Sequence, residues 1–212
     1  MTSAYLILVH KNFEQARRLV KRLLLSDAGV IVHVDSTIET PRDFLTDCHA
    51  NNSRVFAAEQ RHHTQWGSYE AVLAALSLLE EGLRRFPAAR YFTLLSGQDY
   101  PIKSPDYIDN FFRRSESNFV LFRPLLEERW KYGGVRRINR FYWAKNRKSL
   151  TGFCFRTIPF PPRRFPIDTK QLFVGSQWWS IKRDTALRIL EFVRDTPDVL
   201  KAFRWTYIPD EM

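Results

Sequence analysis

The stretch that decides the fold of this chain is residues 4–35, AYLILVHKNFEQARRLVKRLLLSDAGVIVHVD. Residues 4–10 are apolar without alternation, which predicts a strand buried on both faces. Asn12 and Gln15 have the spacing of a capping box, and apolar residues then recur at helical spacing. Residues 30–35 form a second apolar run. A strand, a helix and a strand in this order predict a parallel βαβ unit with a right-handed crossover.

The same alternation continues along the rest of the chain. Apolar runs predict strands, and helical periodicity bounded by capping residues predicts helices. The expected strands are 4–10, 30–35, 54–59, 91–96, 118–123 and 171–181, and the expected helices are 12–24, 41–48, 67–85, 104–114 and 185–194. A length of 212 residues suits one α/β domain. We therefore predict a single α/β domain over residues 1–212, with a mainly parallel sheet flanked by helices.

Residues 124–170 break this pattern, because periodicity is lost and prolines interrupt the chain. We interpret them as an irregular basic excursion within the domain. The slightly longer range 123–170 holds 13 Lys and Arg against 3 Asp and Glu, which equals the whole formal charge of +10. A basic insert on a neutral scaffold predicts an anionic partner such as nucleic acid, nucleotide phosphates, an acidic glycan or a membrane surface. Charge of this kind is, however, also typical of an ordinary solvated face.

Composition bears on the cellular compartment. Cys48 and Cys154 are the two cysteines, too few for a disulfide framework, so a reducing compartment is expected. No apolar run reaches the roughly 18–20 residues that cross a bilayer. The start, Met1-Thr2-Ser3-Ala4, lacks the basic region of a signal peptide. If the source is prokaryotic, we therefore expect a cytoplasmic protein, or a peripheral membrane protein that uses its basic segment. The oligomeric state is left open.

Polar residues follow three of the expected strands. They are His10, Asp35 and the loop 96–99, Ser-Gly-Gln-Asp. Ligands of open α/β sheets bind at the carboxyl ends of the strands, so we expect these residues to face one cleft. Each of them alone would also suit an ordinary turn. The chain has no dinucleotide fingerprint and no phosphate-binding loop, which disfavours a dinucleotide oxidoreductase and a P-loop enzyme. Its histidines do not make a metal set.

Five segments occur in an order that resembles a known family. They are His33-Val34-Asp35, Trp66-Gly67-Ser68, the run 95–104 (LSGQDYPIKS), Gly175-Ser176-Gln177-Trp178-Trp179 and Pro209-Asp210-Glu211. Together they resemble the core-2/I-branching β-1,6-N-acetylglucosaminyltransferases and the related peptide O-xylosyltransferases, glycosyltransferase family 14. The resemblance covers nearly the whole chain, and its most specific piece is the run 96–104.

This resemblance implies a GT-A-like fold, a UDP-sugar donor carrying GlcNAc or xylose, and transfer with inversion to a hydroxyl of a glycan or other acceptor. The family lacks the metal-binding Asp-x-Asp motif, which is absent here too. No metal and no other cofactor is therefore expected, and basic side chains would neutralise the leaving diphosphate. By position, Val9, His10 and Asp35 match the uridine contacts of the family. We assign Gln98 and Asp99, at the same sheet edge, to the donor side as well.

The acceptor side and the base also follow from the resemblance. Arg129 matches an acceptor-binding arginine, and the adjacent Trp130 could stack on a sugar ring. A family lysine three residues before it is Leu126 here, which leaves the acceptor open. Glu211 matches the catalytic base, and inversion by direct displacement needs one such carboxylate within reach of the acceptor hydroxyl. We assign that role to Glu211 and a structural role to Asp210.

The diphosphate-binding Arg and Lys of the family lie after this last motif. We therefore expect the chain to be incomplete at its C-terminus and weakly active or inactive, with Lys170 or Arg183 as alternative local substitutes. Glu211, near the terminus, is expected to be poorly fixed. Two other functions stay open. One is a basic nucleic-acid-binding module built on 123–170, whose aromatic residues would suit a single strand. The other is a catalytically incomplete glycan-binding scaffold.

Overall fold

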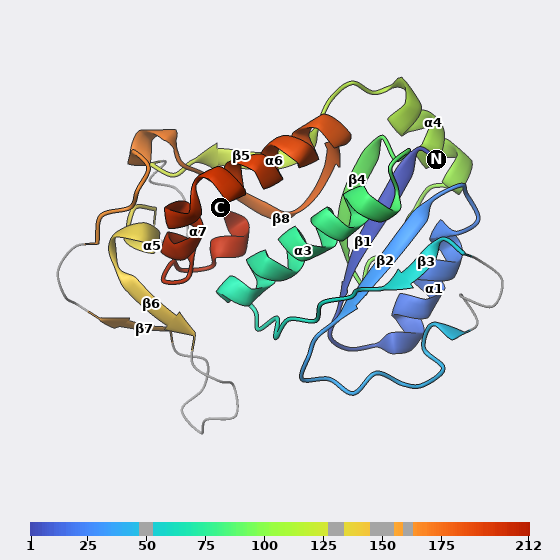
Figure 1. Cartoon of the computed structure of the whole chain (residues 1–212), viewed down its shortest axis with the longest axis horizontal. Coiled ribbons are helices and arrows are strands. Elements are labelled where there is room, and N and C mark those ends of the chain that lie inside the picture. Colours follow the sequence, from blue (N-terminus) through green and yellow to red (C-terminus); the bar gives the residue numbers. More distant parts are fainter. Residues whose placement is uncertain (47–52, 127–133, 145–154, 159–162) are drawn as a thin grey trace. The chain divides into compact units, whose positions relative to one another are not determined.

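The structure is a computed structural model that describes residues 1–46, 53–126, 134–144, 155–158 and 163–212 (Figure 1). Cys48, Arg129, Trp130 and Cys154 lie outside the described residues. The chain divides into two compact units. The first comprises Met1–Thr64, Leu73–Val120 and Trp178–Leu190, and the second comprises Gln65–Val72, Leu121–Gln177 and Glu191–Met212.

The main sheet has six strands in the order β3-β2-β1-β4-β8-β5. The strands are β1 (Ser3–Val9), β2 (Gly29–Val34), β3 (Val55–Ala57), β4 (Tyr91–Ser96), β5 (Phe119–Pro124) and β8 (Phe173–Lys182). β3, β2, β1 and β4 pair in parallel, and β8 pairs antiparallel to β4. The predicted α/β class with a mainly parallel sheet is thus confirmed, and the antiparallel direction of β8 was not among the predictions.

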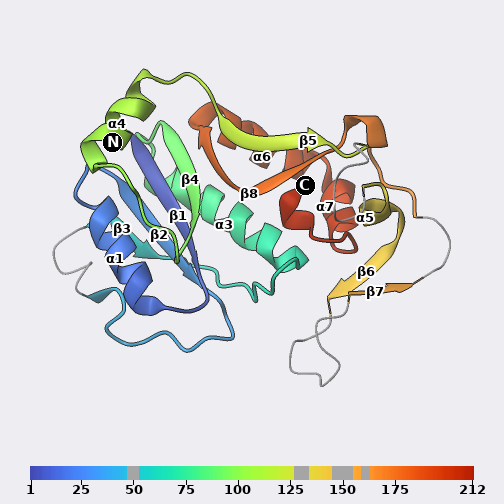
Figure 2. The ribbon, with the colours of Figure 1, turned by 180° about the vertical axis from the view of Figure 1, so that it is seen from behind.

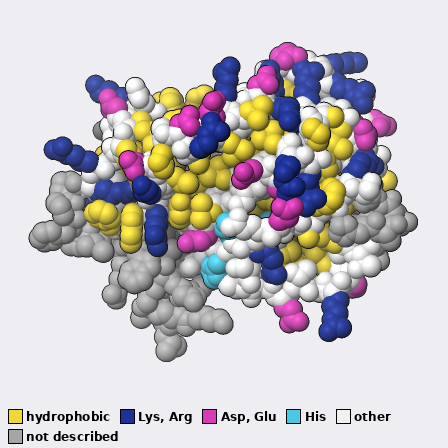
Figure 3. All heavy atoms as spheres, viewed as in Figure 1, with side chains coloured by type: hydrophobic (Ala, Val, Ile, Leu, Met, Phe, Trp, Pro, Cys, Tyr) yellow, Lys and Arg dark blue, Asp and Glu magenta, His cyan; other side chains and the backbone are white. Residues whose placement is uncertain are grey.

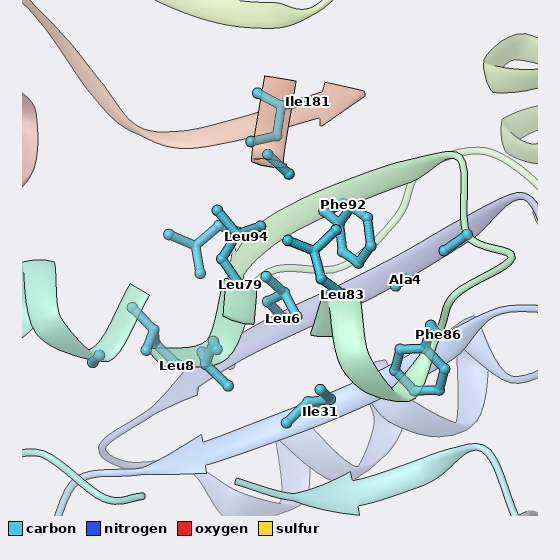
Figure 4. Close-up of a cluster of buried hydrophobic side chains, with 14 residues drawn as sticks. Ala4, Leu6, Leu8, Ile31, Leu79, Leu83, Phe86, Phe92, Leu94 and Ile181 are labelled. Carbon is cyan, nitrogen blue, oxygen red and sulfur yellow. The ribbon is translucent and has the colours of Figure 1, made fainter. Parts of the chain in front are cut away.

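Helices cover both faces of the parallel part of this sheet, as Figures 1 and 2 show from opposite sides. They are α1 (Phe13–Leu23), α3 (Tyr69–Arg85), α4 (Pro105–Arg114) and α6 (Arg183–Asp195). All seven residues of β1 are buried, as its unbroken apolar sequence predicts. Leu6 and Leu8 pack with Leu79 of α3, in the cluster drawn in Figure 4. The alternate residue Ile7 packs with Leu19 of α1 on the other face.

Two helix starts show how far local sequence decides structure. At α4, the Ser104 side chain accepts a hydrogen bond from the Tyr107 backbone N–H (3.2 Å), the cap that Ser104-Pro105 predicts. At α1, the expected capping box does not form. Asn12 is left-handed, with φ 54° and no side-chain cap. The Gln15 amide instead donates to the Asp99 backbone carbonyl (3.3 Å), so a contact across 84 residues replaces the local one.

Other boundaries differ from expectation by a few residues. β3 is shorter than the expected strand 54–59. Residues 42–45 of the expected helix 41–48 are turns, and its last residues lie outside the described ones. β5 lies at the end of the strand order, and its apolar residues are exposed, for example Phe122 to 61%. No helix in the described ranges is both long and apolar enough to cross a membrane.

The second unit has short elements around a small core. They are α5 (Arg136–Asn139), the antiparallel pair β6 (Phe141–Ala144) and β7 (Phe155–Ile158), the 3-10 turn η1 (Thr169–Gln171), α7 (Pro197–Phe203) and the 3-10 turn η2 (Pro209–Glu211). We expected 124–170 to be irregular, but its described part thus contains a helix and a hairpin-like pair. The core includes Leu125, Ile138, Leu172 and Val174, with Met212 packed against it.

Candidate functional site

The carboxyl ends of β1, β2 and β4 lie side by side in the first unit. The Asp35 backbone N–H donates to the Val9 carbonyl (2.9 Å), and the Gly97 N–H donates to the Leu8 carbonyl (2.8 Å). His10, Asp35 and the loop 96–99 therefore follow three neighbouring parallel strands at one edge of the sheet. This is the edge at which α/β proteins bind their ligands. The three segments thus share one sheet edge, while their facing one cleft stays a prediction.

Gly97 explains why the loop after β4 approaches β1 so closely. A Cβ atom at this position would lie 2.8 Å from Val9 Cγ2 and 3.3 Å from Ala16 Cβ, so a larger residue would push the loop away. The loop also closes on itself, because Asp99 Oδ2 accepts a hydrogen bond from the Ser96 backbone N–H (2.8 Å). Glycine in the Ser-Gly-Gln-Asp run thus has a packing reason.

The predicted donor residues differ in exposure. Val9 is buried, His10 and Gln98 are exposed, and Asp99 is half-buried. A cavity of about 200 Å³ lies between β1, β4, α1 and α4, and Asp99 lines it together with mostly apolar side chains. His10, Asp35 and Gln98 do not line this cavity. Their role in donor binding stays a prediction.

Asp35 is held by four hydrogen bonds, a set that we call the Asp35 knot (Asp35, Thr37 and Thr64). Oδ1 accepts from the backbone N–H (2.8 Å) and hydroxyl (2.6 Å) of Thr37. Oδ2 accepts from the backbone N–H (2.6 Å) and hydroxyl (2.9 Å) of Thr64. Burial favours a higher pKa for Asp35, but these hydrogen bonds outweigh it and hold the pKa below its usual range. The knot therefore ties the segment before α3 to the end of β2.

Two more side chains tie the segment before α3 to β2 and to its carboxyl end. Arg61 donates to the backbone carbonyls of Val34 (2.9 Å), Asp35 (2.6 Å) and Ile38 (2.6 Å). The fully buried His33 accepts the His62 backbone N–H at Nε2 (2.8 Å). Burial, then the neighbouring His62, lowers the pKa of His33 to about 4, so its imidazole is neutral at neutral pH. Within the described ranges, no three His, Cys, Asp or Glu side chains gather as metal ligands would.

The last predicted site residues form a turn in the second unit, Pro209–Glu211, which we call the Pro-Asp-Glu turn. Ile208 before it is left-handed, with φ 49°. The fully buried Arg137 of α5 reaches this turn. Its Nε donates to the Tyr207 carbonyl (3.0 Å), and its Nη2 donates to the Ile208 carbonyl (2.5 Å) and to Glu211 Oε2 (3.3 Å). We expected Glu211 to be poorly fixed near the terminus, but Arg137 holds it.

The two carboxylates of this turn have different surroundings. The Glu211 side chain is 27% exposed and pairs with Arg137. Asp210 is more enclosed, and burial raises its pKa to about 6. Its Oδ1 is buried and has no hydrogen-bond partner in the described part of the chain. The structural role that we predicted for Asp210 stays a prediction.

Sequence reasoning missed Arg137, Thr37 and Thr64. Arg137 was counted among the excess charges of the basic excursion, and the only hint of burial is its position between Val135 and Ile138, which belong to the core of the second unit. Of the two proposed substitutes for diphosphate binding, Lys170 is exposed. The backbone N–H of Arg183 donates to the Arg90 carbonyl, at the amino end of β4. Arg183 therefore lies at the sheet edge opposite the one that carries Asp35.

Charged groups on the face drawn in Figure 3 are mixed. Lys and Arg side chains alternate there with acidic and apolar ones. Several arginines of the first unit are paired, as Arg84 and Arg85 are with Glu59. In the second unit, Arg137 and Arg163 bind carbonyls within the unit. Some of the basic excess of the sequence is thus used inside the protein.

Comparison with known proteins identifies the family of the chain that carries this sheet edge and this turn. A model of the family "Branch: Core-2/I-Branching enzyme" matches residues 3–212, so the chain belongs to that family. The resemblance that the five motifs suggested is thereby confirmed.

The names of the curated relatives specify the transferred sugar and the acceptor more closely than the family name does. A "Beta-1,3-galactosyl-O-glycosyl-glycoprotein beta-1,6-N-acetylglucosaminyltransferase" of Bos taurus is 28% identical over 98% of this chain and 46% of its own length. The human protein of the same name is 26% identical, with the same coverage. A mouse "N-acetyllactosaminide beta-1,6-N-acetylglucosaminyl-transferase" is 22% identical over 98% of this chain and 50% of its own length. The chain spans about half the length of the curated relatives it matches.

Proposed function

We propose that this chain forms the core of an inverting glycosyltransferase that moves a sugar from a UDP-sugar to an acceptor hydroxyl without a metal ion. The observation that carries this proposal is the family match over residues 3–212. The names of the relatives favour GlcNAc as the sugar and a galactose-containing glycan as the acceptor. Xylose is the second donor to test, because the motifs also resemble the peptide O-xylosyltransferases.

In the proposed reaction Glu211 acts as the base. The acceptor oxygen attacks C1 of the donor sugar, the bond from C1 to the diphosphate oxygen breaks, and UDP leaves. The acceptor proton passes to the Glu211 carboxylate, so the step is balanced without another reactant. Partial exposure and a fixed cationic partner suit Glu211 for this role, because a base must be both accessible and oriented.

The sheet edge of the first unit is the proposed donor side. His10 and Gln98 are exposed there and offer hydrogen-bonding groups. Asp35 uses both carboxylate oxygens within its knot, so we propose that it shapes this edge through Thr37 and Thr64. Val9 is buried at the end of β1 and stays a proposal for the uridine side. Arg129 and Trp130 stay proposals for the acceptor side.

The experiment that tests the proposal measures transfer by the natural protein that contains this sequence. UDP-GlcNAc and UDP-xylose would be offered with galactose-terminated acceptors, with and without EDTA. We expect transfer from one donor to be unaffected by EDTA. Strict dependence on Mn²⁺ would contradict metal independence, and no transfer from any UDP-sugar would contradict the proposed function.

The base is tested separately with Glu211→Gln, which keeps shape and hydrogen bonding but cannot accept the proton. Loss of a general base lowers kcat by roughly 10²–10⁴-fold. We expect this loss while UDP binding, measured by calorimetry, stays within about twofold. Glu191→Gln is the matched control, since Glu191 is an exposed residue of α6. Wild-type turnover by Glu211→Gln would exclude Glu211 as the base.

A further inference from the structure

Arg137 is an unusual residue for a basic surface segment. Its side chain is fully buried, whereas charged side chains are rarely so enclosed unless they are paired. Each side-chain hydrogen bond that it makes to the described residues goes to the segment 207–211, two of them to backbone carbonyls and one to a carboxylate. The guanidinium is therefore dedicated to one short piece of chain.

Stability alone does not account for a guanidinium at this position. Burial lowers the pKa of Arg137, which means that desolvation of its charge is costly. Its Nη1 is buried without a partner among the described residues. Apolar side chains of similar volume often replace buried ion pairs with no loss of stability. A methionine or leucine would thus fill the space, but it could not hold the carbonyls or the carboxylate.

The backbone at Ile208 shows what Arg137 holds in place. A β-branched residue with φ 49° is a genuine outlier, and such strain persists only where the surroundings over-determine it. Arg137 Nη2 binds the Ile208 carbonyl and Glu211 Oε2 together. One nitrogen therefore links the strained backbone to the carboxylate that follows three residues later.

We propose that Arg137 is the positioning residue for Glu211, and that it fixes the Pro-Asp-Glu turn so that this carboxylate is held in the orientation required of a base. The inference rests on the proposed function. Among the contacts of the described residues, Oε2 of Glu211 is engaged by Arg137. Oε1 is left to accept the proton of the acceptor hydroxyl.

The test is a double-mutant cycle on kcat with Arg137→Met, Glu211→Gln and the combination. Misplacing a reacting group by about 1 Å can cost about 10²-fold in rate, so we expect Arg137→Met to lower kcat by about that factor. Donor KM should change by less than about twofold. In the Glu211→Gln background, Arg137→Met should cause no further loss, because Arg137 acts through the carboxylate. Additive losses in kcat would overturn the inference.

Arg163→Met is the matched control. Arg163 is a half-buried arginine of the same unit that donates to the Ala202 carbonyl and to the Thr206 hydroxyl (3.5 Å). Among the described residues it pairs with no carboxylate. We expect Arg163→Met to lower the melting temperature and to leave kcat within about twofold of wild type. A loss of kcat equal to that of Arg137→Met would show that Arg137 acts only through general stability.

A second variant distinguishes loss of function from loss of folding. If Arg137→Met does not fold, Arg137→Lys replaces it in the cycle. A single ammonium cannot make all three contacts, so kcat should fall by about tenfold, the low end for loss of an orienting partner. Wild-type kcat in Arg137→Lys would overturn the inference.

Thermal unfolding tests the contact without the reaction. Glu211→Gln should lower Tm by about 2 °C in wild type and by much less in the Arg137→Met or Arg137→Lys background. Equal shifts in both backgrounds would overturn the inference. If the wild type transfers no sugar, the proposed function fails, and the coupling in Tm then shows separately whether Arg137 holds Glu211.

Discussion

Two enclosed aspartates, one in each unit, show how partners rather than burial decide what a carboxylate does. Asp35 is 5% exposed and accepts four hydrogen bonds from Thr37 and Thr64. Its pKa lies below the usual range. Asp210 has a buried oxygen without a partner in the described part of the chain, and its pKa is raised to about 6. Asp35 therefore anchors the structure as an ionised carboxylate. Asp210 keeps its proton up to a higher pH than an ordinary aspartate does.

The difference also separates two ways of fixing a segment. The Asp35 carboxylate uses neutral donors from threonines, and the backbone beside it is held by Arg61 and by the neutral, buried His33. The Pro-Asp-Glu turn uses a buried cation, Arg137. The stability of a knot of neutral donors around an ionised carboxylate does not change with pH above the pKa of that carboxylate. A turn held by a cation beside two carboxylates is expected to respond to pH.

The largest expected effect is loss of the knot. Asp35→Ala leaves four donors without their acceptor, and each unsatisfied buried group costs about 1–3 kcal/mol. We expect the free energy of unfolding to fall by about 4 kcal/mol, measured by urea denaturation. Asp43→Ala is the matched control, because Asp43 is 74% exposed and pairs only at 3.5 Å with Arg17. An equal loss in both variants would remove the distinction between the knot and an ordinary surface aspartate.

The next effect comes from His33, whose pKa of about 4 lies below the ordinary histidine value of 6.5. The unfolded chain binds the proton first as pH falls, so stability should fall from about pH 6.5 down to pH 4, by about 3 kcal/mol in all. His62, Asp35 and Arg61 are the ionisable groups that face it. His33→Gln keeps an acceptor for the His62 N–H and should remove this part of the pH dependence. Urea denaturation from pH 4 to 7.5 measures it, and an unchanged profile would refute a neutral His33.

Asp210 should produce the opposite slope in the same measurement. Its pKa is raised from 3.8 to about 6, so the folded chain binds the proton more tightly than the unfolded one. Stability should therefore fall as pH rises from about 4 to 6, by at most about 3 kcal/mol. Asp210→Asn should abolish this fall and be at least as stable as wild type at pH 7. A destabilised Asp210→Asn with an unchanged slope would mean that Asp210 is as firmly anchored as Asp35.

The smallest expected effect is the loss of stability when one hydroxyl donor of the knot is removed. Thr64→Val and Thr37→Val each remove one hydroxyl donor and keep the backbone N–H. We expect each to lower the free energy of unfolding by about 1 kcal/mol. Thr46→Val is the control, because its exposed hydroxyl makes one hydrogen bond within the described ranges, to the Arg42 carbonyl (3.3 Å), and it should change stability by less than about 0.5 kcal/mol. Losses near zero in the first two variants would show that the backbone donors alone hold Asp35.

Much of the first unit could be predicted, because its signals are local. The apolar runs of β1, β2 and β4 and the Ser104-Pro105 cap are readable in windows of a few residues, and the structure has them. Parallel strands then place His10, Asp35 and Gln98 at one edge. The capping box at Asn12 failed because a contact between Gln15 and the distant Asp99 competed with the local one.

The second unit was harder to predict for the same physical reason. Arg137 resembles every other arginine of a basic segment until Tyr207 and Glu211 are brought to it from 70 and 74 residues away. In the first unit, Thr64 was missed for the same reason, because it reaches Asp35 across 29 residues. A family resemblance names the residue at a catalytic position, but the side chains that hold it appear only when the chain is folded. The need for glycine at position 175 is likewise visible only in the folded chain, since a Cβ there would lie 1.7 Å from the Leu121 carbonyl oxygen of the neighbouring strand.

The distance along the chain between Arg137 and the Pro-Asp-Glu turn also bears on the order of assembly. The three parallel strands that carry the sheet edge lie within the first 96 residues, so this edge can form while the rest of the chain is still being synthesised. The contacts of Arg137 span 70 to 74 residues, and contacts of long sequence separation form late because their loops must close first. The sheet edge proposed for the donor is thus expected to form before Arg137 holds Glu211, the proposed base. Under the proposed function, a nascent or partly unfolded chain would bind nucleotide before it could transfer sugar.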